Sequence, residues 1–200
     1  PMQELLNEAK RLASEGVKEL VLVAQETTLY GKDLTGEKQL PLLLHELCKI
    51  EGIEWIRLLY CYPEEITDEL IKVIKTEEKV CNYIDMPIQH SENRILQRMG
   101  RRTSREDLVA VIKKLRKEIP DITIRTTLIT GFPGESQEDH EGLMNFVEEC
   151  QFDRLGVFTY SPEEDTLAAT FEDQIDEEVK EERRDELMSL QQEISYDKGT

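Results

Sequence analysis

Two kinds of apolar spacing alternate along this chain, one typical of helices and one typical of strands. Residues 1–16 carry apolar side chains at helical spacing and end on Gly16, which predicts a helix closed by a glycine. The next run, "ELVLVAQ" (19–25), is short and continuously apolar, as in a strand covered on both faces. Further helices are predicted over 39–50, 66–75, 103–118, 136–150 and 176–195, and further strands over 55–61, 83–86, 122–129 and 154–160.

Strands that alternate with helices predict an α/β fold with parallel strands and right-handed crossovers. Helix starts have capping chemistry, since Ser104 precedes Asp107 and Ser136 precedes Asp139. Pro87 is expected to end the pairing of the strand before it. The pattern leaves open a closed barrel, a partial barrel or an open doubly wound sheet. Because no linker or low-complexity segment interrupts it, the whole chain, residues 1–200, is predicted to be one domain.

The carboxyl ends of the predicted strands all carry hydrogen-bonding or aromatic groups. In either kind of α/β fold, the ligand site lies at these ends, and typical pockets combine apolar walls with a few fixed polar groups. We therefore predict a binding site there, with Asp85 close enough to its strand end to join it. In chain order the ends are Gln25 to Thr28, Tyr60 to Pro63, Met86 to His90, "TGFPGES" (130–136) and Thr159 to Pro162.

Taken singly, these residues have structural interpretations that are about as good. Gln25 could cap a helix and His90 could begin one. The loop "GFPGES" precedes a helix, but it lacks the Lys-Ser/Thr ending of a P-loop and the GxGxxG spacing, which disfavours a nucleotide phosphate site. Gly131 and Gly134 are better explained by a backbone that passes close to a flat ring.

Composition and charge limit the possible partners. The formal net charge of −18 disfavours binding of nucleic acid phosphates by these residues. Residues 163–186 hold twelve Asp and Glu against three Lys and Arg, most simply as a solvated helix face, with a dedicated docking surface as the alternative. No apolar run approaches the roughly 20 residues of a membrane span, and no signal peptide is present. We therefore predict a soluble, cytoplasmic chain.

Cysteines and histidines give no local metal site. The four cysteines are well separated and form no CxxC, so no metal ligand is predicted. Cys48 and Cys150 fit buried thiols, and Cys61 is kept as a possible site residue. His45 and His140 fall on predicted helices and are expected at the surface. Since no catalytic triad emerges, no catalytic residue is assigned and a bound cofactor is expected to carry the chemistry.

Five segments around the predicted strand ends resemble one known family. Together, and in this order, they are similar to the radical S-adenosylmethionine (radical SAM) domain of the methylthiotransferases, over nearly all 200 residues. The branch that modifies an aspartate of a ribosomal protein resembles this chain most, because the tRNA-modifying branch differs at the first three strand ends. Asp165 stands where the family usually has glycine. The segments are "LVLVAQETTLYG", "IRLLYCYP", "YIDMPIQHSENRILQRMGRR", "TTLITGFPGES" and "FDRLGVFTYSPEEDT".

This resemblance implies a partial (β/α) barrel of the radical SAM type, with parallel strands and outer helices. The family binds a [4Fe–4S] cluster with a CxxxCxxC loop just upstream of a segment like "PMQELL", and none of the cysteines here matches that loop. The first strand and the cluster loop, an N-terminal domain with a second cluster and a C-terminal TRAM domain are therefore expected outside this sequence. On this view the chain is a fragment of the radical SAM domain and is inactive on its own.

The resemblance also implies an activity for the intact enzyme. S-adenosylmethionine and two [4Fe–4S] clusters would serve to add a methylthio group to the β-carbon of an aspartate, after a 5′-deoxyadenosyl radical has taken its hydrogen. A basic small-subunit ribosomal protein and an electron donor are the implied partners, with no membrane and no strong nucleic-acid binding. The implied cofactor-binding residues are Gln25, Thr27, Thr28, Gln89, Ile129, Gly131 and Phe132, and the implied substrate-facing residues are Tyr60, Tyr62, His90, Tyr160 and Ser161.

Other functions stay open at this stage. A tRNA adenosine methylthiotransferase shares "GFPGE" and the Tyr-Ser-Pro turn of residues 160–162. A cluster-free α/β-barrel lyase or aldolase would place its pocket at the same strand ends. A binding or assembly module is a third interpretation, which describes the fragment better than the intact protein.

Overall fold

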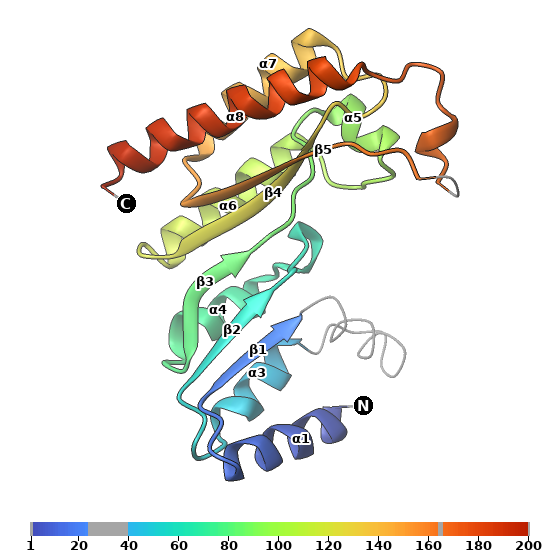
Figure 1. Cartoon of the computed structure of the whole chain (residues 1–200). Helices are drawn as coiled ribbons and strands as arrows, with labels where there is room; N and C mark the ends of the chain where they lie inside the picture. The colour runs from blue at the N-terminus through green and yellow to red at the C-terminus, as the bar shows by residue number, and fades with distance from the viewer. Residues whose placement is uncertain (1, 24–39, 164–165, 200) are drawn as a thin grey trace. The chain divides into compact units, whose positions relative to one another are not determined.

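The computed structural model describes residues 2–23, 40–163 and 166–199 (Figure 1). These residues fall into two compact units, one formed by residues 2–23, 40–86 and 113–123 and the other by residues 87–112, 124–163 and 166–199. Helices and parallel strands alternate through each unit, so the predicted α/β class is confirmed. The single domain stays a prediction, and each unit is described by itself.

The first unit is a parallel sheet with helices packed against it. β1 pairs with β2 along its whole length, and β2 pairs with β3. Helix α3 packs against both α1 and α4, and α4 packs on β3. The core is aliphatic, since Leu40, Leu44, Ile56 and Leu70 are at most 1% exposed. The elements are α1 (Met2–Ser14), β1 (Glu19–Val23), α3 (Leu40–Cys48), β2 (Trp55–Leu59), the 3-10 turn η1 (Pro63–Glu65), α4 (Asp68–Thr76) and β3 (Val80–Asp85).

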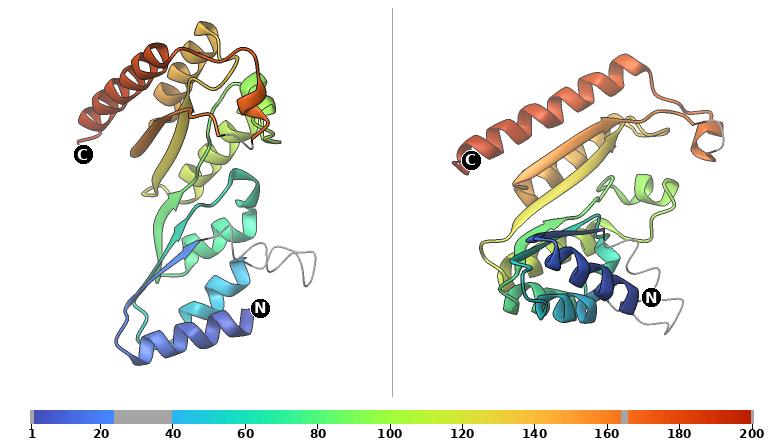
Figure 2. Two further views of the ribbon diagram at one scale, coloured as in Figure 1. Left: turned by 45° about the vertical axis from the view of Figure 1, so that its right-hand side comes forward. Right: turned by 60° about the horizontal axis from the view of Figure 1, so that its bottom comes forward.

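The second unit holds the remaining pair of parallel strands. β4 and β5 are in register from Arg125↔Arg154 to Thr130↔Thr159. Helices α7 and α8 pack together, and α8 also lies along β5 (Figure 2). The buried rings of Phe146 and Phe152, 5.9 Å apart between centroids, fill the core. The elements are α5 (Asn93–Arg98), α6 (Arg105–Glu118), β4 (Thr123–Thr130), α7 (Gln137–Cys150), β5 (Arg154–Thr159), the 3-10 turn η2 (Ala168–Thr170) and α8 (Glu177–Asp197), with the last part of α6 and the first residue of β4 belonging to the first unit.

Helix α8 buries a polar stripe. Its buried residues recur at helical spacing, as expected for a helix that covers a core. The first two of them, Lys180 and Arg183, are charged, and only the later turns bury aliphatic side chains. The stripe consists of Lys180, Arg183, Leu187, Gln191 and Ile194.

Capping side chains fix the helix starts as predicted. Ser136 accepts a hydrogen bond from the N–H of Asp139, whose carboxylate accepts one from the N–H of Ser136, which completes a capping box before α7. Ser104 and Asp107 make the same reciprocal pair before α6. These bonds satisfy N–H groups that the first helical turn leaves without a partner.

Several local predictions need correction. β3 begins at Val80, before the predicted residue 83, and β2 ends at Leu59, before the predicted residue 61. His140 is 1% exposed, which makes the expected surface position wrong. Because α8 packs against α7, it covers His140, whose Nε2 lies 2.6 Å from Glu186 Oε2. His45 is at the surface, as predicted.

The buried-thiol predictions are borne out unevenly. Cys150 is buried, as expected, whereas Cys48 is only half-buried. Burial is the main factor that raises the pKa of the Cys48 thiol to about 11, so the thiol stays protonated at neutral pH. Cys61 lies just past β2 and is fully buried. Within residues 2–23, 40–163 and 166–199, no helix combines the length and the apolar character that a membrane crossing requires.

The capping box gives a first test of the fold. We expect Ser136→Ala to lower the free energy of unfolding by about 1 kcal/mol, because the N–H of Asp139 loses its acceptor. The matched control is Ser189→Ala, at an exposed position inside α8. There alanine has the higher helix propensity, so stability should stay equal or rise slightly. Urea unfolding of the intact protein measures both; equal losses would contradict the role of the cap.

Candidate functional site

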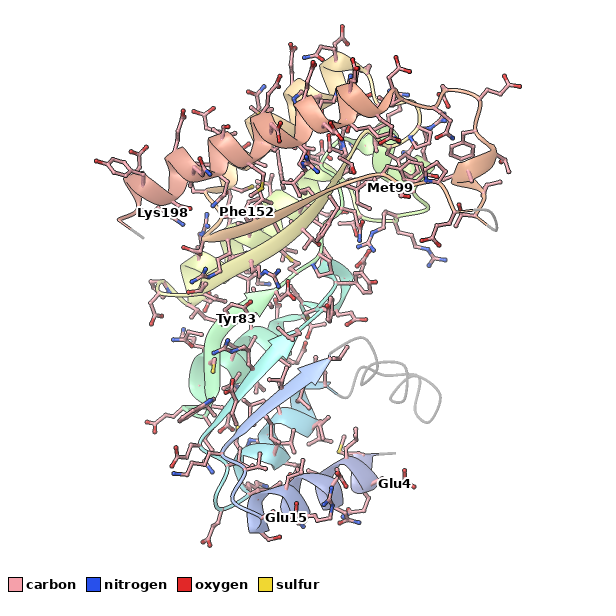
Figure 3. The ribbon with its side chains drawn as sticks, in the orientation of Figure 1. Glu4, Glu15, Tyr83, Met99, Phe152 and Lys198 are labelled. Carbon is pink, nitrogen blue, oxygen red and sulfur yellow. The ribbon has the colours of Figure 1, made fainter. Side chains whose placement is uncertain are left out.

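A cavity of about 540 Å³ lies in the second unit, where the chain leaves β4. It brings together three of the predicted site residues, Gln89, Ile129 and Phe132. The rest of its wall comes from the end of α5 with the residues that follow it, and from the segment that leads into η2. The lining residues are Gln89, Gln97, Arg98, Met99 (labelled in Figure 3), Gly100, Arg101, Ile129, Phe132, Thr166, Leu167 and Ala168.

Gln89 enters this wall with an unusual backbone. Its φ of 77° lies in the left-handed region, which costs a residue with a Cβ on the order of 1 kcal/mol. Two hydrogen bonds hold it there: its N–H donates to Thr127 O at 3.0 Å, and its carbonyl accepts from the N–H of Ile129 at 2.8 Å. Strand pairing therefore resumes beyond Pro87, where we expected it to end. Strained residues held in this way are concentrated at functional sites.

Two aromatic rings pack against Phe132, which lines the cavity. The ring of Phe132 meets those of Tyr160 and Phe171 edge to face, at centroid distances of 5.2 and 6.4 Å. Tyr160 continues β5, and its N–H donates to Thr130 O at 2.9 Å. Its buried Oη has no hydrogen-bond partner among the residues that the structure describes. A buried hydroxyl without a partner is costly, and Tyr160 is not among the residues that line the cavity.

A buried carboxylate closes the loop between β4 and α7. Glu135 is 2% exposed, and its Oε1 accepts from the N–H of Gly131 at 3.0 Å and from Arg183 Nη1 at 2.7 Å. Its Oε2 lies 2.7 Å from His90 Nε2. Burial alone would raise the pKa of Glu135, but the hydrogen bonds from His90, Gly131 and Arg183 outweigh it and lower the pKa. Glu135 therefore stays ionised inside the fold.

His90 has an internal role in this structure. Its imidazole is fully buried, with Nε2 beside Glu135, and Nδ1 accepts from the N–H of Glu92 at 3.1 Å. Both ring nitrogens are thus accounted for, and His90 is not part of the cavity wall. The substrate-facing role of His90 stays a prediction, and the contacts in this structure are with Glu135 and Glu92.

The other predicted site residues lie in several places. Tyr60 and Tyr62 belong to the first unit, where Tyr60 is 51% exposed with a φ of 54°. Ser161 is exposed. Gly131 neighbours the cavity wall, and its backbone packs against the side chain of Lys180. Gln25, Thr27 and Thr28 lie outside the described residues. The ligand roles of all these residues stay predictions.

Sequence reasoning missed several residues of the site. Glu135 stands in the quoted "GFPGES", which was interpreted through its glycines, and Arg98 and Arg101 stand in "ILQRMGRR", which entered only as part of a segment that resembles the family. Arg98 is bound by its neighbours: Nε donates to Pro133 O at 3.1 Å, and Nη2 lies 2.7 Å from Asp173 Oδ1. The signal that could have shown a site is the density of arginines from 94 to 105 in an otherwise acidic chain.

The cavity suits an organic ligand, and the described residues do not suit a metal cluster. Its volume and its mixed apolar and polar wall are typical of small-molecule sites. In the part of the chain that the structure describes, no three His, Cys, Asp or Glu side chains are grouped so as to hold a metal ion. The cysteines at 48, 61, 81 and 150 form no disulfide, and they are not grouped as the ligands of a [4Fe–4S] cluster must be.

Comparison with known proteins places this fold. The family model described as the radical SAM superfamily matches residues 1–147. The structure of coproporphyrinogen III oxidase (HemN) from Escherichia coli is similar with a TM-score of 0.69 and 17% identity, over 96% of this chain and 46% of that one. The structure of the methyltransferase TsrM from Kitasatospora setae is similar with a TM-score of 0.60 and 16% identity, over 80% and 31%. These likenesses show the fold alone, and they confirm the predicted partial barrel architecture.

Two curated relatives are much closer in sequence. The ribosomal protein uS12 methylthiotransferases RimO of Lachnoclostridium phytofermentans and Clostridium perfringens are 63% and 59% identical over 199 and 194 residues. The alignments cover 100% and 97% of this chain but 45% and 44% of the relatives, so the chain spans under half of their length. From the family match and these identities, the chain belongs to the radical SAM superfamily.

Proposed function

We propose that the protein containing this chain is a radical SAM methylthiotransferase that modifies an aspartate of ribosomal protein uS12. The observation that carries the proposal is the 63% identity, over the whole chain, to an enzyme named for that activity. The tRNA-modifying and the lyase or aldolase alternatives receive no comparable support. Superfamily membership implies S-adenosylmethionine and a [4Fe–4S] cluster. A second cluster and an electron donor are part of the proposal, with all cluster ligands outside these residues.

The cavity is the proposed site for S-adenosylmethionine, which supplies the hydrogen-abstracting radical when it is bound. Ile129, Phe132 and Leu167 give an apolar wall suited to the adenine ring. Gln89 offers a carboxamide for hydrogen bonds with the polar groups of the cofactor. Arg101 gives a cationic wall suited to the carboxylate of its amino-acid part. The side chains thus orient the cofactor and exclude water around it.

A basic protein substrate agrees with the charge of the chain. Ribosomal proteins carry many Lys and Arg, and the net charge here is −18. The first turn of α8 is acidic at Glu177 and Glu178, and the helix remains rich in exposed carboxylates. Complementary charge steers association between proteins, so we propose that the acidic surface raises the rate at which the substrate protein is captured.

Substrate choice tests the proposed activity directly. The intact enzyme, reconstituted with iron and sulfide, is given S-adenosylmethionine, a sulfur source and either uS12 or tRNA. Mass spectrometry should find the methylthio group on an aspartate of uS12 and none on tRNA. Modification of tRNA instead would overturn the proposal.

Binding of uS12 to the intact enzyme should also weaken as salt rises, because the Debye length falls from about 10 Å at 0.1 M to about 3 Å at 1 M. An affinity for uS12 that does not change with salt concentration would exclude electrostatic steering.

Two substitutions at Gln89 distinguish the effect of backbone strain on stability from the effect of ligand contact on affinity. We expect Gln89→Ala and Gln89→Gly to weaken S-adenosylmethionine binding to the same extent, because both lack the carboxamide in the cavity wall. The glycine variant should be more stable than the alanine variant by about 1 kcal/mol, because only glycine adopts the observed φ without strain. Calorimetric titration of the intact enzyme and urea unfolding measure the two effects. Unimpaired binding by both variants would remove Gln89 from the site.

The buried Glu135 predicts a pH dependence of stability. At neutral pH, Glu135→Gln should lower the free energy of unfolding by about 2–3 kcal/mol, because Arg183 and His90 lose a buried anionic partner. The lowered folded-state pKa means that this advantage of the wild type is complete above the unfolded-state pKa of about 4.3 and is lost as pH falls through the folded-state value.

A neighbouring glutamate provides the control for this test. Glu138 is exposed on the first turn of α7, so Glu138→Gln should change stability little at any pH. Urea midpoints of the wild type and Glu135→Gln should therefore differ at neutral pH and converge as the pH falls. The midpoint of Glu138→Gln should stay close to that of the wild type throughout. A gap that widens on acidification would contradict the assignment.

A further inference from the structure

Lys180 is an unusual residue to find inside a protein. It comes from the first turns of α8 and is 1% exposed. Burial of an ammonium group is expensive unless the group is paired and hydrogen-bonded. Its Nζ donates to the carbonyl of Tyr160 at 3.0 Å and to Glu177 Oε1 at 2.9 Å. The Glu177 side chain is 71% exposed, so the contact inside the fold is the one with Tyr160.

The stem of Lys180 occupies the space that Gly131 leaves free. A Cβ at Gly131 would lie 2.2 Å from Lys180 Cγ and 2.9 Å from its Cβ and Cδ, far inside van der Waals contact. The φ of 74° at Gly131 also favours glycine. The lysine stem and the loop backbone are therefore packed directly on each other, and neither can move without the other.

Through these contacts Lys180 is connected to two parts of the structure next to the cavity wall, the Tyr160 ring and the turn at Gly131. Its Nζ lies 5.3 Å from the centroid of the Tyr160 ring, within cation–π range. That ring packs edge to face on Phe132, which lines the cavity. One side chain thus holds the end of β5 by a carbonyl, the Tyr160 ring by its charge and the turn at Gly131 by its methylene groups.

We propose that Lys180 is a positioning residue, which fixes Phe132 and Tyr160 and thereby sets the shape of the ligand cavity without touching the ligand. This proposal rests on the proposed function as far as it names S-adenosylmethionine as that ligand. A purely structural lysine would be replaceable, since buried charges often contribute no net stability compared with apolar residues of similar volume. The charge is retained here because it orients Tyr160.

Lys180→Met tests the proposal, because methionine keeps an unbranched stem against Gly131 and removes only the ammonium group. In the intact reconstituted enzyme, we expect the KM for S-adenosylmethionine cleavage to rise about tenfold while kcat changes little, as displaced positioning contacts predict. Thermal stability should stay equal or increase. Glu177→Gln is the matched control: it removes the exposed partner of Lys180 and should change neither KM nor stability.

Hydrogen exchange of the same proteins provides a readout that does not depend on catalysis. In Lys180→Met, exchange should accelerate in residues 130–135 and 159–161 and stay unchanged in β2 of the first unit. Unchanged exchange in residues 130–135 and 159–161 would overturn the proposal, as would faster exchange with an unaltered KM. If the wild-type enzyme fails to bind S-adenosylmethionine, the proposed function falls, while hydrogen exchange still decides whether Lys180 positions Tyr160.

Discussion

The structure of the second unit depends on the hydrogen-bond donors that surround one buried carboxylate. Glu135 cannot remain ionised away from water unless donors surround it, and they come from three places: its own loop at Gly131, the segment after β3 at His90, and α8 at Arg183. The same contacts therefore define the turn after β4, orient the imidazole and dock the final helix. A loop that is tied to two other segments through its only carboxylate has few alternative conformations, as a cavity wall requires.

Helix α8 extends this arrangement by a second cation. Arg183 holds the carboxylate of the loop, and Lys180, one turn earlier, packs against the glycine at the start of that loop. Aliphatic side chains at these two positions would bury as much surface, but they would not select one position for Tyr160 or Glu135. Burial of Lys180 and Arg183 removes two charges from water but fixes the positions of Tyr160 and Glu135. Leu187 and Ile194, farther along α8, bury apolar surface only.

The sequence was informative where local physics decides the structure. Periodicity located the helices and strands, and cap residues located helix starts such as Ser136, because these signals act over a few residues. The internal partner of His90 and the packing of Lys180 on Gly131 were not predictable, since each joins segments more than 40 residues apart. His140 shows the same limit: its own helix gave no sign that α8 would cover it. The strand-end rule found Gln89 and Phe132, and the family resemblance added Ile129, but neither indicated the arginines that complete their cavity.

The backbone at position 89 restricts which amide can serve there. Asparagine tolerates a positive φ several times better than glutamine and carries the same carboxamide, so backbone conformation alone would favour asparagine. The chain nevertheless has glutamine, one methylene longer, and accepts the strain. Reach is the property that distinguishes the two side chains, because glutamine carries its amide one methylene farther from a backbone that is held between Thr127 and Ile129 in the cavity wall.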